Sequence, residues 1–360
     1  MNSPQPQPAC VRARKENPAI GIVNNYADSD ETRLFLTPEA CGMISNFGYK
    51  IVMETGAGTD INYTDGDYAA NNVEIVSRDK ALGAADIVLS VRPLRAEDVD
   101  RMKPRAALIT LFDRDLFDRS LIERYLKREV TLMALDSMCS ANGLPIFRRI
   151  LEEIDGRAAI LYVEDGISFL GEGKGVLLAG VAGVNQCEVL IIGAGLRPAF
   201  AAKAAIAAGA KVTLMDNDVS SLYEAKNFCG DALVTSVIHP HVLYNSVKSA
   251  DVIILDRCTR DFEFPRQLSV AMKQSVYFLD LTQTVPSLSV PRTVAMGISN
   301  PLINFFEEAT IKGGLNSMIA NTSGVRESVL TYRGKLVDKY IAMRTGLAAV
   351  NIKMMLTQTN

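Results

Sequence analysis

Two glycines and an aspartate, spaced as in a dinucleotide-binding turn, are the residues of this sequence best suited to chemistry. Gly193 and Gly195 follow the apolar segment 189–192, an alanine-rich segment comes next, and Asp216 ends the following apolar segment. The first glycine permits a tight turn, and the second lets the backbone approach a pyrophosphate bound by the N–H groups of the next helix. Asp216 is expected to accept hydrogen bonds from a ribose 2′-hydroxyl and to repel a 2′-phosphate. The pattern therefore predicts binding of NAD.

The same turn departs from the usual pattern at its third glycine. Pro198 stands in that place, where a small residue normally allows close packing of helix on strand, and it removes one N–H near the phosphates. A proline in the first helical turn is sterically tolerated. Arg197 beside it supplies positive charge, so Leu196 and Arg197 join the two glycines and Asp216 as predicted cofactor-binding residues. The alternative is a Rossmann-like domain whose site is decayed or empty.

The histidines and cysteines form no metal-binding pattern. His239 and His241, the only two histidines, have no clustered cysteine or third carboxylate ligand, and we interpret them as loop residues. The six cysteines contain no C-x-x-C pair, which argues against a zinc site and a disulfide framework and favours a cytoplasmic location. No metal is predicted. Lys174, among glycines, either approaches the cofactor or stabilises a helix end.

The composition is typical of a globular chain with a small-molecule partner. Of the 360 residues, 48% are apolar, which is enough for a large core and about two domains. The net charge of −3 provides no basic field for nucleic acid or anionic lipid. No apolar run is long enough to cross a bilayer, and residues 1–18 are expected to be a disordered tail rather than a signal peptide. We predict neither nucleic acid nor membrane binding.

Two series of short apolar strands, each alternating with helical segments, must position these residues. Such alternation predicts an α/β fold in which crossover helices join parallel strands. Thr37 and Pro38 mark the start of the first helix. Segment 144–170 is expected to be a long connecting helix, and from about residue 300 the chain is expected to return to the first domain as helices. The predicted strands are 19–23, 50–55, 86–91, 107–112 and 130–135, then 189–192, 211–216, 251–256 and 276–281.

Several stretches, taken in order, resemble the alanine dehydrogenase and pyridine nucleotide transhydrogenase α-subunit family. The similarity runs from about residue 19 to about residue 345 and includes both flanks of the glycine turn. Unrelated Rossmann proteins would not reproduce both flanks in this order. The stretches are ETRLFLTPEA (31–40), GYKIVMETGAG (48–58), GEGKGVLLAGVAGV (171–184), VPRT (290–293) and TYRGKLVDKYIA (331–342).

The resemblance implies two Rossmann-like, doubly wound parallel-sheet domains joined by long helices. The first is discontinuous, a substrate domain of residues 19–143 plus 300–360. Residues 144–299 are the NAD-binding domain with its connecting helix, and the substrate lies in the cleft. Members of the family form dimers or hexamers, so a homodimer or homohexamer is expected.

The resemblance also implies which residues act. The family's dehydrogenases oxidise L-alanine to pyruvate and ammonia with NAD. In them an early arginine and a later lysine hold the carboxylate, while a histidine and an aspartate handle protons and water. Arg33 matches the arginine and suits bidentate carboxylate binding. A surface charge is the alternative for Arg33.

The other three family positions have changed. Arg92 takes the place of the lysine, keeping the charge but not the geometry; an exposed turn is the alternative. Asp113, or a residue next to it, takes the place of the histidine, and an ordinary aspartate is a poor acid near neutrality. A solvated loop is the alternative for Asp113. Thr284 falls near the expected aspartate, and the glycine-rich loop that covers the nicotinamide in the family is missing. The predicted catalytic residues are Arg33, Arg92 and Asp113.

Three functions remain open. The first is a cytoplasmic NAD-dependent oxidoreductase of the alanine dehydrogenase type, which deaminates a small L-amino acid or reductively aminates its 2-keto acid. The second is a catalytically degenerate NAD-binding protein that serves as a sensor or assembly partner. The third is a transhydrogenase-like subunit.

Overall fold

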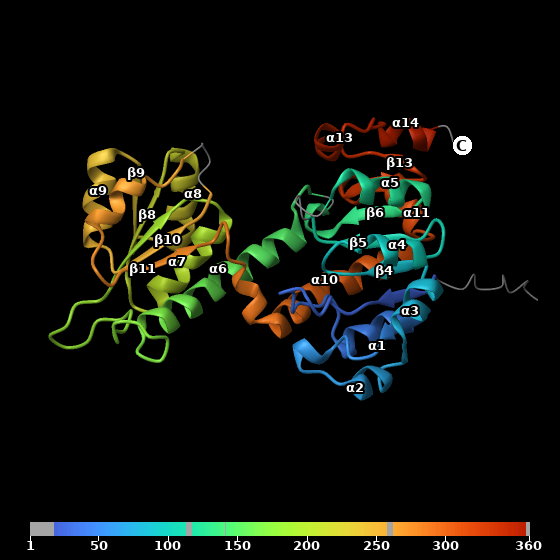
Figure 1. Ribbon diagram of the computed structural model, residues 1–360, viewed down its shortest axis with the longest axis horizontal. Coiled ribbons are helices and arrows are strands. Elements are labelled where there is room, and N and C mark those ends of the chain that lie inside the picture. The colour runs from blue at the N-terminus through green and yellow to red at the C-terminus, as the bar shows by residue number, and fades with distance from the viewer. Residues whose placement is uncertain (1–17, 113–116, 141, 258–261, 358–360) are drawn as a thin grey trace, which may run out of the picture.

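The computed structural model describes residues 18–112, 117–140, 142–257 and 262–357, which form two α/β units along the long axis of the molecule (Figure 1). We call them the eight-stranded unit and the five-stranded unit after their sheets. The long helices α6 (Ile146–Ile167) and α10 (Pro291–Ile311) pack against each other between the two sheets. The predicted fold class, two Rossmann-like doubly wound units joined by long helices with the first unit discontinuous, is confirmed. The predicted tail, except for its last residue, lies outside the described residues.

The eight-stranded sheet extends in both directions from strand β1. Its order is β13-β12-β6-β5-β4-β1-β2-β3. Strands β2 and β3 follow β1 on one side of the sheet, and β4, β5, β6, β12 and β13 follow on the other side. Strands β1 to β6 are parallel, whereas β12 is antiparallel to β6 and β13 to β12. The order reverses between β1 and β4, the place where such sheets bind ligands. The strands are β1 (Ile20–Ile22), β2 (Ile51–Glu54), β3 (Val73–Val76), β4 (Ile87–Leu89), β5 (Ala107–Thr110), β6 (Thr131–Ala134), β12 (Val329–Tyr332) and β13 (Lys335–Leu336).

Several helices of this unit begin at a capping side chain. Thr37 accepts a hydrogen bond from the N–H of Ala40, and Pro38 is the first residue of the helix, as predicted. Asp118 and Asp338 cap two later helices in the same way. The helices and 3-10 turns are α1 (Pro38–Asn46), η1 (Thr59–Ile61), α2 (Asp65–Ala69), α3 (Arg78–Ala84), α4 (Ala96–Arg101), α5 (Arg119–Lys127), η2 (Leu135–Ser137), α11 (Leu315–Asn321), α12 (Ser323–Glu327), α13 (Lys339–Thr345) and α14 (Ile352–Thr357).

The five-stranded sheet is parallel throughout, in the order β11-β10-β7-β8-β9. Its strands are apolar runs, as expected for strands covered on both faces. The order reverses between β7 and β10, directly beside the glycine turn. Its elements are β7 (Glu188–Ile192), α7 (Leu196–Ala207), β8 (Lys211–Asp216), α8 (Val219–Cys229), β9 (Leu233–Val237), α9 (Pro240–Ser249), β10 (Val252–Leu255), η3 (Arg266–Ala271), β11 (Tyr277–Asp280) and η4 (Pro286–Ser289).

Helix α6 contributes to both hydrophobic cores. Phe147 and Leu151 in its first half pack into the core of the eight-stranded unit, whereas Ala159 and Val163 in its second half pack into that of the five-stranded unit. The predicted long connecting helix is therefore confirmed. Throughout the described ranges, every helix is too short or too polar to cross a lipid bilayer.

Candidate nucleotide and substrate site

The turn after β7 has the backbone geometry that the glycine pattern predicts. Gly193 has a φ of +108°, and a Cβ at this position would lie 2.9 Å from the carbonyl oxygen of Arg257. Both the positive φ and the close backbone therefore require glycine here. Gly195 is the N-cap of α7, and no side chain caps the helix. The first N–H groups of a helix lack intrahelical acceptors, so this end is suited to a pyrophosphate.

Pro198 is accommodated in the first turn of α7, where it is buried. Close packing next to it comes from the opposite helix. Gly156 of α6 faces this turn, and a Cβ on Gly156 would lie 2.4 Å from the carbonyl oxygen of Arg197 and 2.7 Å from the Cβ of Phe200. A glycine on α6 thus allows close packing of α6 on α7 at this turn, whereas the third glycine of the motif usually serves the packing of helix on strand.

Arg197 is bound to a carboxylate of the chain itself. Its Nε lies 2.8 Å from Oδ2 of Asp256, and its Nη2 lies 2.5 Å from Oδ1. Burial alone would lower the pKa of Arg197, but the hydrogen bonds and charge of Asp256, with the charges of Asp155 and Glu152, raise it. Arg197 therefore lies at the switch point, engaged in an internal ion pair, and its binding to a cofactor stays a prediction.

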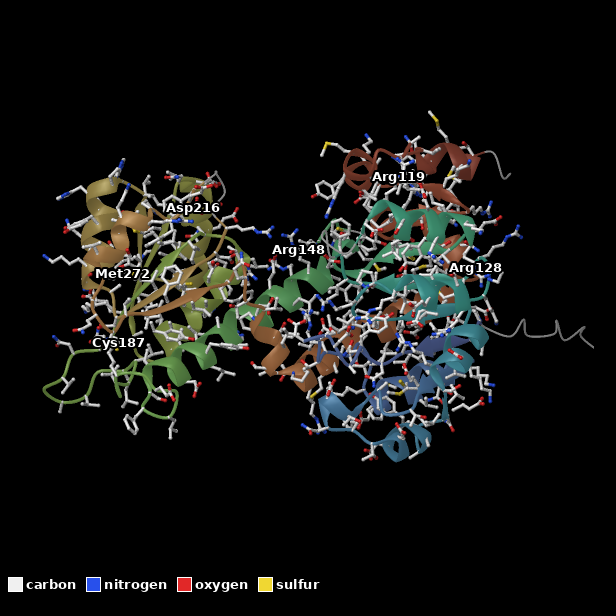
Figure 2. All side chains as sticks on the ribbon, in the orientation of Figure 1. Arg119, Arg128, Arg148, Cys187, Asp216 and Met272 are labelled. Carbon is white, nitrogen blue, oxygen red and sulfur yellow. The ribbon has the colours of Figure 1, made fainter. Side chains whose placement is uncertain are left out.

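Asp216 is fully buried beneath the glycine turn. Its Oδ2 accepts the N–H of Ala194 at 2.9 Å, and its Oδ1 accepts the N–H of Asp218 at 2.9 Å. The carboxylate thereby holds the turn in shape, and its binding to a ribose stays a prediction. Figure 2 shows Asp216 and Cys187, the residue before β7, at opposite ends of the five-stranded unit.

Arg33 lies where the segment between β1 and α1 meets η4. Its guanidinium makes two 2.8 Å bonds to the carboxylate of Glu31, and its Nη1 donates to the Oγ of Ser287 at 3.3 Å. The neighbouring Thr32 donates to the carbonyl oxygen of Leu288 at 2.6 Å. Only 12% of the Arg33 side chain is exposed, so this arginine is not a solvated surface charge.

Asp155 of α6 connects Arg33 with the nucleotide turn. It is buried, and its Oδ1 accepts the N–H of Ser287 at 2.9 Å. Burial alone would lower the pKa of Arg33, but the hydrogen bonds and charge of Glu31 and the charge of Asp155 raise it. The charge of Asp155 also raises the pKa of Arg197. The arginine predicted to bind substrate and the arginine predicted to bind cofactor therefore lie within electrostatic reach of one buried carboxylate.

Arg92 and Arg33 contact the same short segment. Arg92 follows β4, and its Nη1 lies 3.0 Å from the Oγ of Ser29 and 3.1 Å from Oδ1 of Asp30, next to the Glu31 that binds Arg33. The structure thus brings the two predicted carboxylate-binding arginines to one loop at the switch point between β1 and β4. Asp113 lies outside the described residues. Thr284 lies in the turn after β11, where its N–H donates to the carbonyl oxygen of Asp280.

Asp136, which the sequence did not single out, follows β6 on the same sheet edge. Its Oδ1 accepts the N–H of Phe112 at 2.8 Å, directly before the predicted position of the acid. Burial raises the pKa of Asp136, while nearby Arg148 and Glu152 of α6 act in opposite directions. Asp136 therefore keeps its proton up to a higher pH than an exposed aspartate does.

Lys174 lies away from the nucleotide turn. Its Nζ is 2.8 Å from Oδ1 of Asp251, which precedes β10 at the sheet edge opposite the turn. Lys273 binds the same oxygen at 2.9 Å. Of the two interpretations of Lys174, the structure therefore favours the stabilising one.

We expect Asp251→Asn to lower the free energy of unfolding by about 2 kcal/mol at pH 7. Burial alone would raise the pKa of Asp251, but bonds from Lys174, the N–H of Glu188 and Lys273 lower it from 3.8 to about 2. Because the folded-state pKa is depressed, this stability is present above pH 3.8 and is lost as the pH falls toward 2. Urea unfolding at several pH values checks this. The difference in free energy of unfolding between Asp251→Asn and the wild type should become smaller below pH 4. Asp231, whose side chain is fully exposed, is the control, and Asp231→Asn should have the same free energy of unfolding as the wild type.

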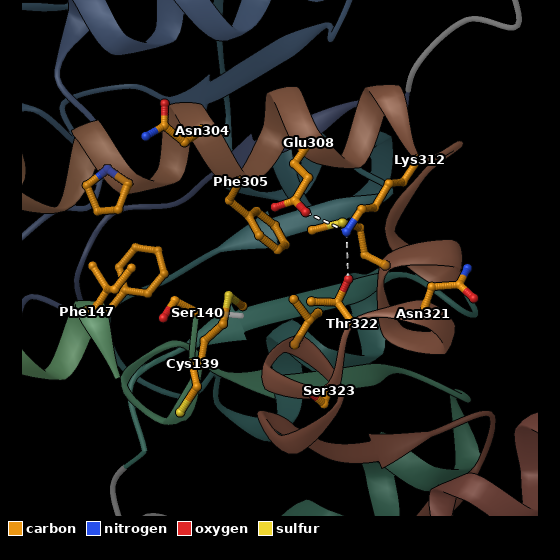
Figure 3. Close-up of a pocket in the computed structure, with 15 residues that line it drawn as sticks. Cys139, Ser140, Phe147, Asn304, Phe305, Glu308, Lys312, Asn321, Thr322 and Ser323 are labelled. Atoms are coloured by element: carbon orange, nitrogen blue, oxygen red, sulfur yellow. Dashed lines mark hydrogen bonds and ion pairs between the residues drawn. The ribbon is translucent and has the colours of Figure 1, made fainter. Parts of the chain in front are cut away.

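A cavity of about 400 Å³ lies elsewhere, between the start of α6, α10 and the α11–α12 segment (Figure 3). Phe147, Phe305 and Met318 line its apolar part, and Lys312 bridges Glu308 and Thr322 at one end. The cavity contains none of the predicted site residues. Among the described residues, His, Cys, Asp and Glu side chains form no group of three or more that could hold a metal.

Comparison with known proteins agrees with this architecture. The chain matches the family described as alanine dehydrogenase/PNT, with the N-terminal domain matching residues 21–150 and the C-terminal domain residues 167–256. The chain belongs to the alanine dehydrogenase and pyridine nucleotide transhydrogenase family. The predicted resemblance is therefore confirmed.

Individual relatives and solved structures are also similar to this chain. The chain is 24% identical to the alanine dehydrogenase of Bacillus subtilis, over 91% of this chain and 94% of the relative. It is 30% identical to that of Methanococcus maripaludis, over 65% of this chain and 63% of the relative. A solved L-alanine dehydrogenase superposes with a TM-score of 0.78 at 22% identity, over 90% of this chain and 98% of the other. A transhydrogenase from Sinorhizobium meliloti superposes with a TM-score of 0.74 at 15% identity, over 89% of this chain and 100% of the other. The last two likenesses concern the fold alone.

Proposed function

We propose that this chain is an NAD-dependent oxidoreductase of the alanine dehydrogenase type, acting on a small L-amino acid or on its 2-keto acid. The observation that carries the proposal is that two neighbouring residues of α6 contact both predicted sites: Asp155 accepts the N–H of Ser287, whose hydroxyl Arg33 contacts, and Gly156 packs against the backbone of Arg197. Arg33 and Arg197, which are 164 positions apart in the sequence, are thereby brought to one short stretch of α6. A reaction between substrate and cofactor requires such convergence.

The residues present fit a dinucleotide at the turn. Gly193 and Gly195 supply the backbone shape, and α7 begins without a capping side chain. Its first N–H groups and Arg197 would hold the pyrophosphate, with Asp216 at the ribose. When bound, the nicotinamide supplies a hydride acceptor or donor.

The substrate is held through its carboxylate. Arg33 offers the planar fork of donors that fits a carboxylate, and Arg92 adds a second positive charge at the same loop. Because Glu31 occupies the fork, a substrate carboxylate must take its place. We further propose a homodimer or homohexamer in the cytoplasm, and analytical ultracentrifugation measures that assembly.

A second function has an observation in its favour. Two of the three predicted ligand-binding arginines are neutralised inside the chain by buried carboxylates, Arg33 by Glu31 and Arg197 by Asp256. A catalytically degenerate NAD-binding protein, acting as a sensor or assembly partner, would tolerate such pairs.

A substrate panel separates the two functions. The purified chain is incubated with NAD and each small L-amino acid, and in the reverse direction with NADH, ammonia and each 2-keto acid. We expect NADH absorbance to change with at least one small substrate. Binding of NAD without turnover of any substrate would favour the sensor, and the absence of both would contradict both functions.

A further inference from the structure

The ion pair between Arg197 and Asp256 crosses the switch point of the five-stranded sheet. Arg197 is in the first turn of α7, which follows β7, while Asp256 directly follows the neighbouring strand β10. Only 6% of the Asp256 side chain and 20% of that of Arg197 are exposed. The Oδ1 of Asp256 also accepts the N–H of Arg257 at 2.7 Å. The pair is therefore well ordered and shielded from water.

The segment that carries Asp256 lies directly against the glycine turn. A Cβ on Gly193 would come within 3.2 Å of the backbone of Asp256 and within 2.9 Å of the carbonyl oxygen of Arg257. In doubly wound sheets the phosphates of a dinucleotide lie beside this turn, at the switch point. The carboxylate of Asp256 thus binds the guanidinium of Arg197, a residue of the helix turn beside which the phosphates are expected.

Carboxylate and phosphate compete for such a guanidinium. Both bind a guanidinium through two parallel hydrogen bonds, so a phosphate cannot take the Nε–Nη2 edge of Arg197 while Asp256 holds that edge. Asp256 also repels a pyrophosphate through its charge, and the charges of Asp155 and Glu152 add to the negative potential around Arg197.

We propose that the Arg197–Asp256 pair is a latch on the nucleotide position, and that Asp256 sets the affinity for nucleoside diphosphates. Arg197 exchanges the carboxylate of Asp256 for a phosphate when a dinucleotide binds. This proposal rests on the proposed function for its location, but it concerns binding and is independent of turnover.

Asp256→Asn tests the latch, because asparagine keeps the shape and removes the charge. We expect the variant to bind both NAD and ADP about tenfold more tightly than the wild type, measured by calorimetry. Asp280→Asn is the matched control. Asp280 ends the adjacent strand β11, and among the contacts described its carboxylate binds only Thr282 of its own turn. The Asp280→Asn variant should therefore bind NAD and ADP with the affinities of the wild type. When Arg197→Met is already present, adding Asp256→Asn should increase the affinity for NAD and ADP much less than it does in the wild type, because the guanidinium that would bind the phosphate is missing.

Equal or weaker binding of both ligands by the folded Asp256→Asn variant would overturn the latch. A crystal structure of the wild type with ADP tests it without any substitution: Arg197 should contact a phosphate and no longer Asp256, and an intact pair beside bound ADP would contradict the proposal. If ADP binding tightens while no substrate is turned over, the latch holds and the enzymatic function fails. If turnover occurs and Asp256→Asn leaves both affinities unchanged, only the latch fails.

Discussion

Arg33→Met should abolish substrate binding and also weaken the fold. The guanidinium holds the carboxylate of Glu31, whose side chain is only 3% exposed, so its removal leaves a buried carboxylate without its cationic partner, bound only by the backbone N–H of residue 33 among the contacts described. Breaking a buried pair in this way costs about 3–5 kcal/mol. Loss of the fork that binds the substrate carboxylate should lower kcat/KM about a hundredfold or more. Chemical unfolding and steady-state kinetics measure the two effects.

The double variant Glu31→Gln with Arg33→Met separates the two roles of Arg33. Removing both charges should recover much of the lost stability, because no unpaired carboxylate remains, while activity stays low. Arg33→Lys keeps the charge without the planar fork and should fall between wild type and Arg33→Met in kcat/KM. Unchanged turnover in Arg33→Met would show that another group binds the substrate carboxylate.

Gly156→Ala should destabilise the protein although alanine is the better helix former. Propensity alone favours alanine by about 1 kcal/mol. The new Cβ would lie 2.4 Å from the carbonyl oxygen of Arg197 and 2.9 Å from the backbone nitrogen of Ala201. These are backbone atoms of α7, so no side-chain rotation relieves the clash, and overpacking of this kind costs about 1–3 kcal/mol or more. We expect a net loss of about 1–2 kcal/mol, and weaker nucleotide binding because the first turn of α7 must shift.

Gly83→Ala is the matched control for Gly156→Ala. Gly83 is exposed in α3, and the nearest atom to a Cβ there is 3.8 Å away, an ordinary contact. The same substitution should therefore be neutral or stabilising by up to about 1 kcal/mol. Urea unfolding midpoints of the two variants measure the difference, and a stable Gly156→Ala would mean that α6 and α7 do not meet as described.

The sequence predicted the elements whose signals are local. Apolar runs marked most strands, Thr37 and Pro38 marked the start of α1, and the glycine pattern marked the turn after β7. Strands β3 and β9 were not predicted, because VEIV at 73–76 is short and carries a charge and LVTSV at 233–237 is interrupted by two hydroxyl residues. The hairpin of β12 and β13 was also missed. Arg333 and Gly334 both have positive φ, as a two-residue hairpin turn requires, although TYRGK lacks the usual asparagine or aspartate.

The partners of the site residues were not predictable, because they depend on contacts between distant segments. Arg33 meets Ser287 across 254 positions, and Arg197 meets Asp256 across 59. Asp155 resembles the other acidic residues of α6 in the sequence, and only the fold shows that it is buried and accepts the N–H of Ser287.

The central claim is that the turn after β7 binds NAD, and a calorimetric titration of the purified chain with NAD and with NADP tests it most directly. We expect one NAD per chain, and binding of NADP at least about tenfold weaker because Asp216 repels the 2′-phosphate. Heats indistinguishable from dilution with both nucleotides, or equal affinity for the two, would contradict the claim.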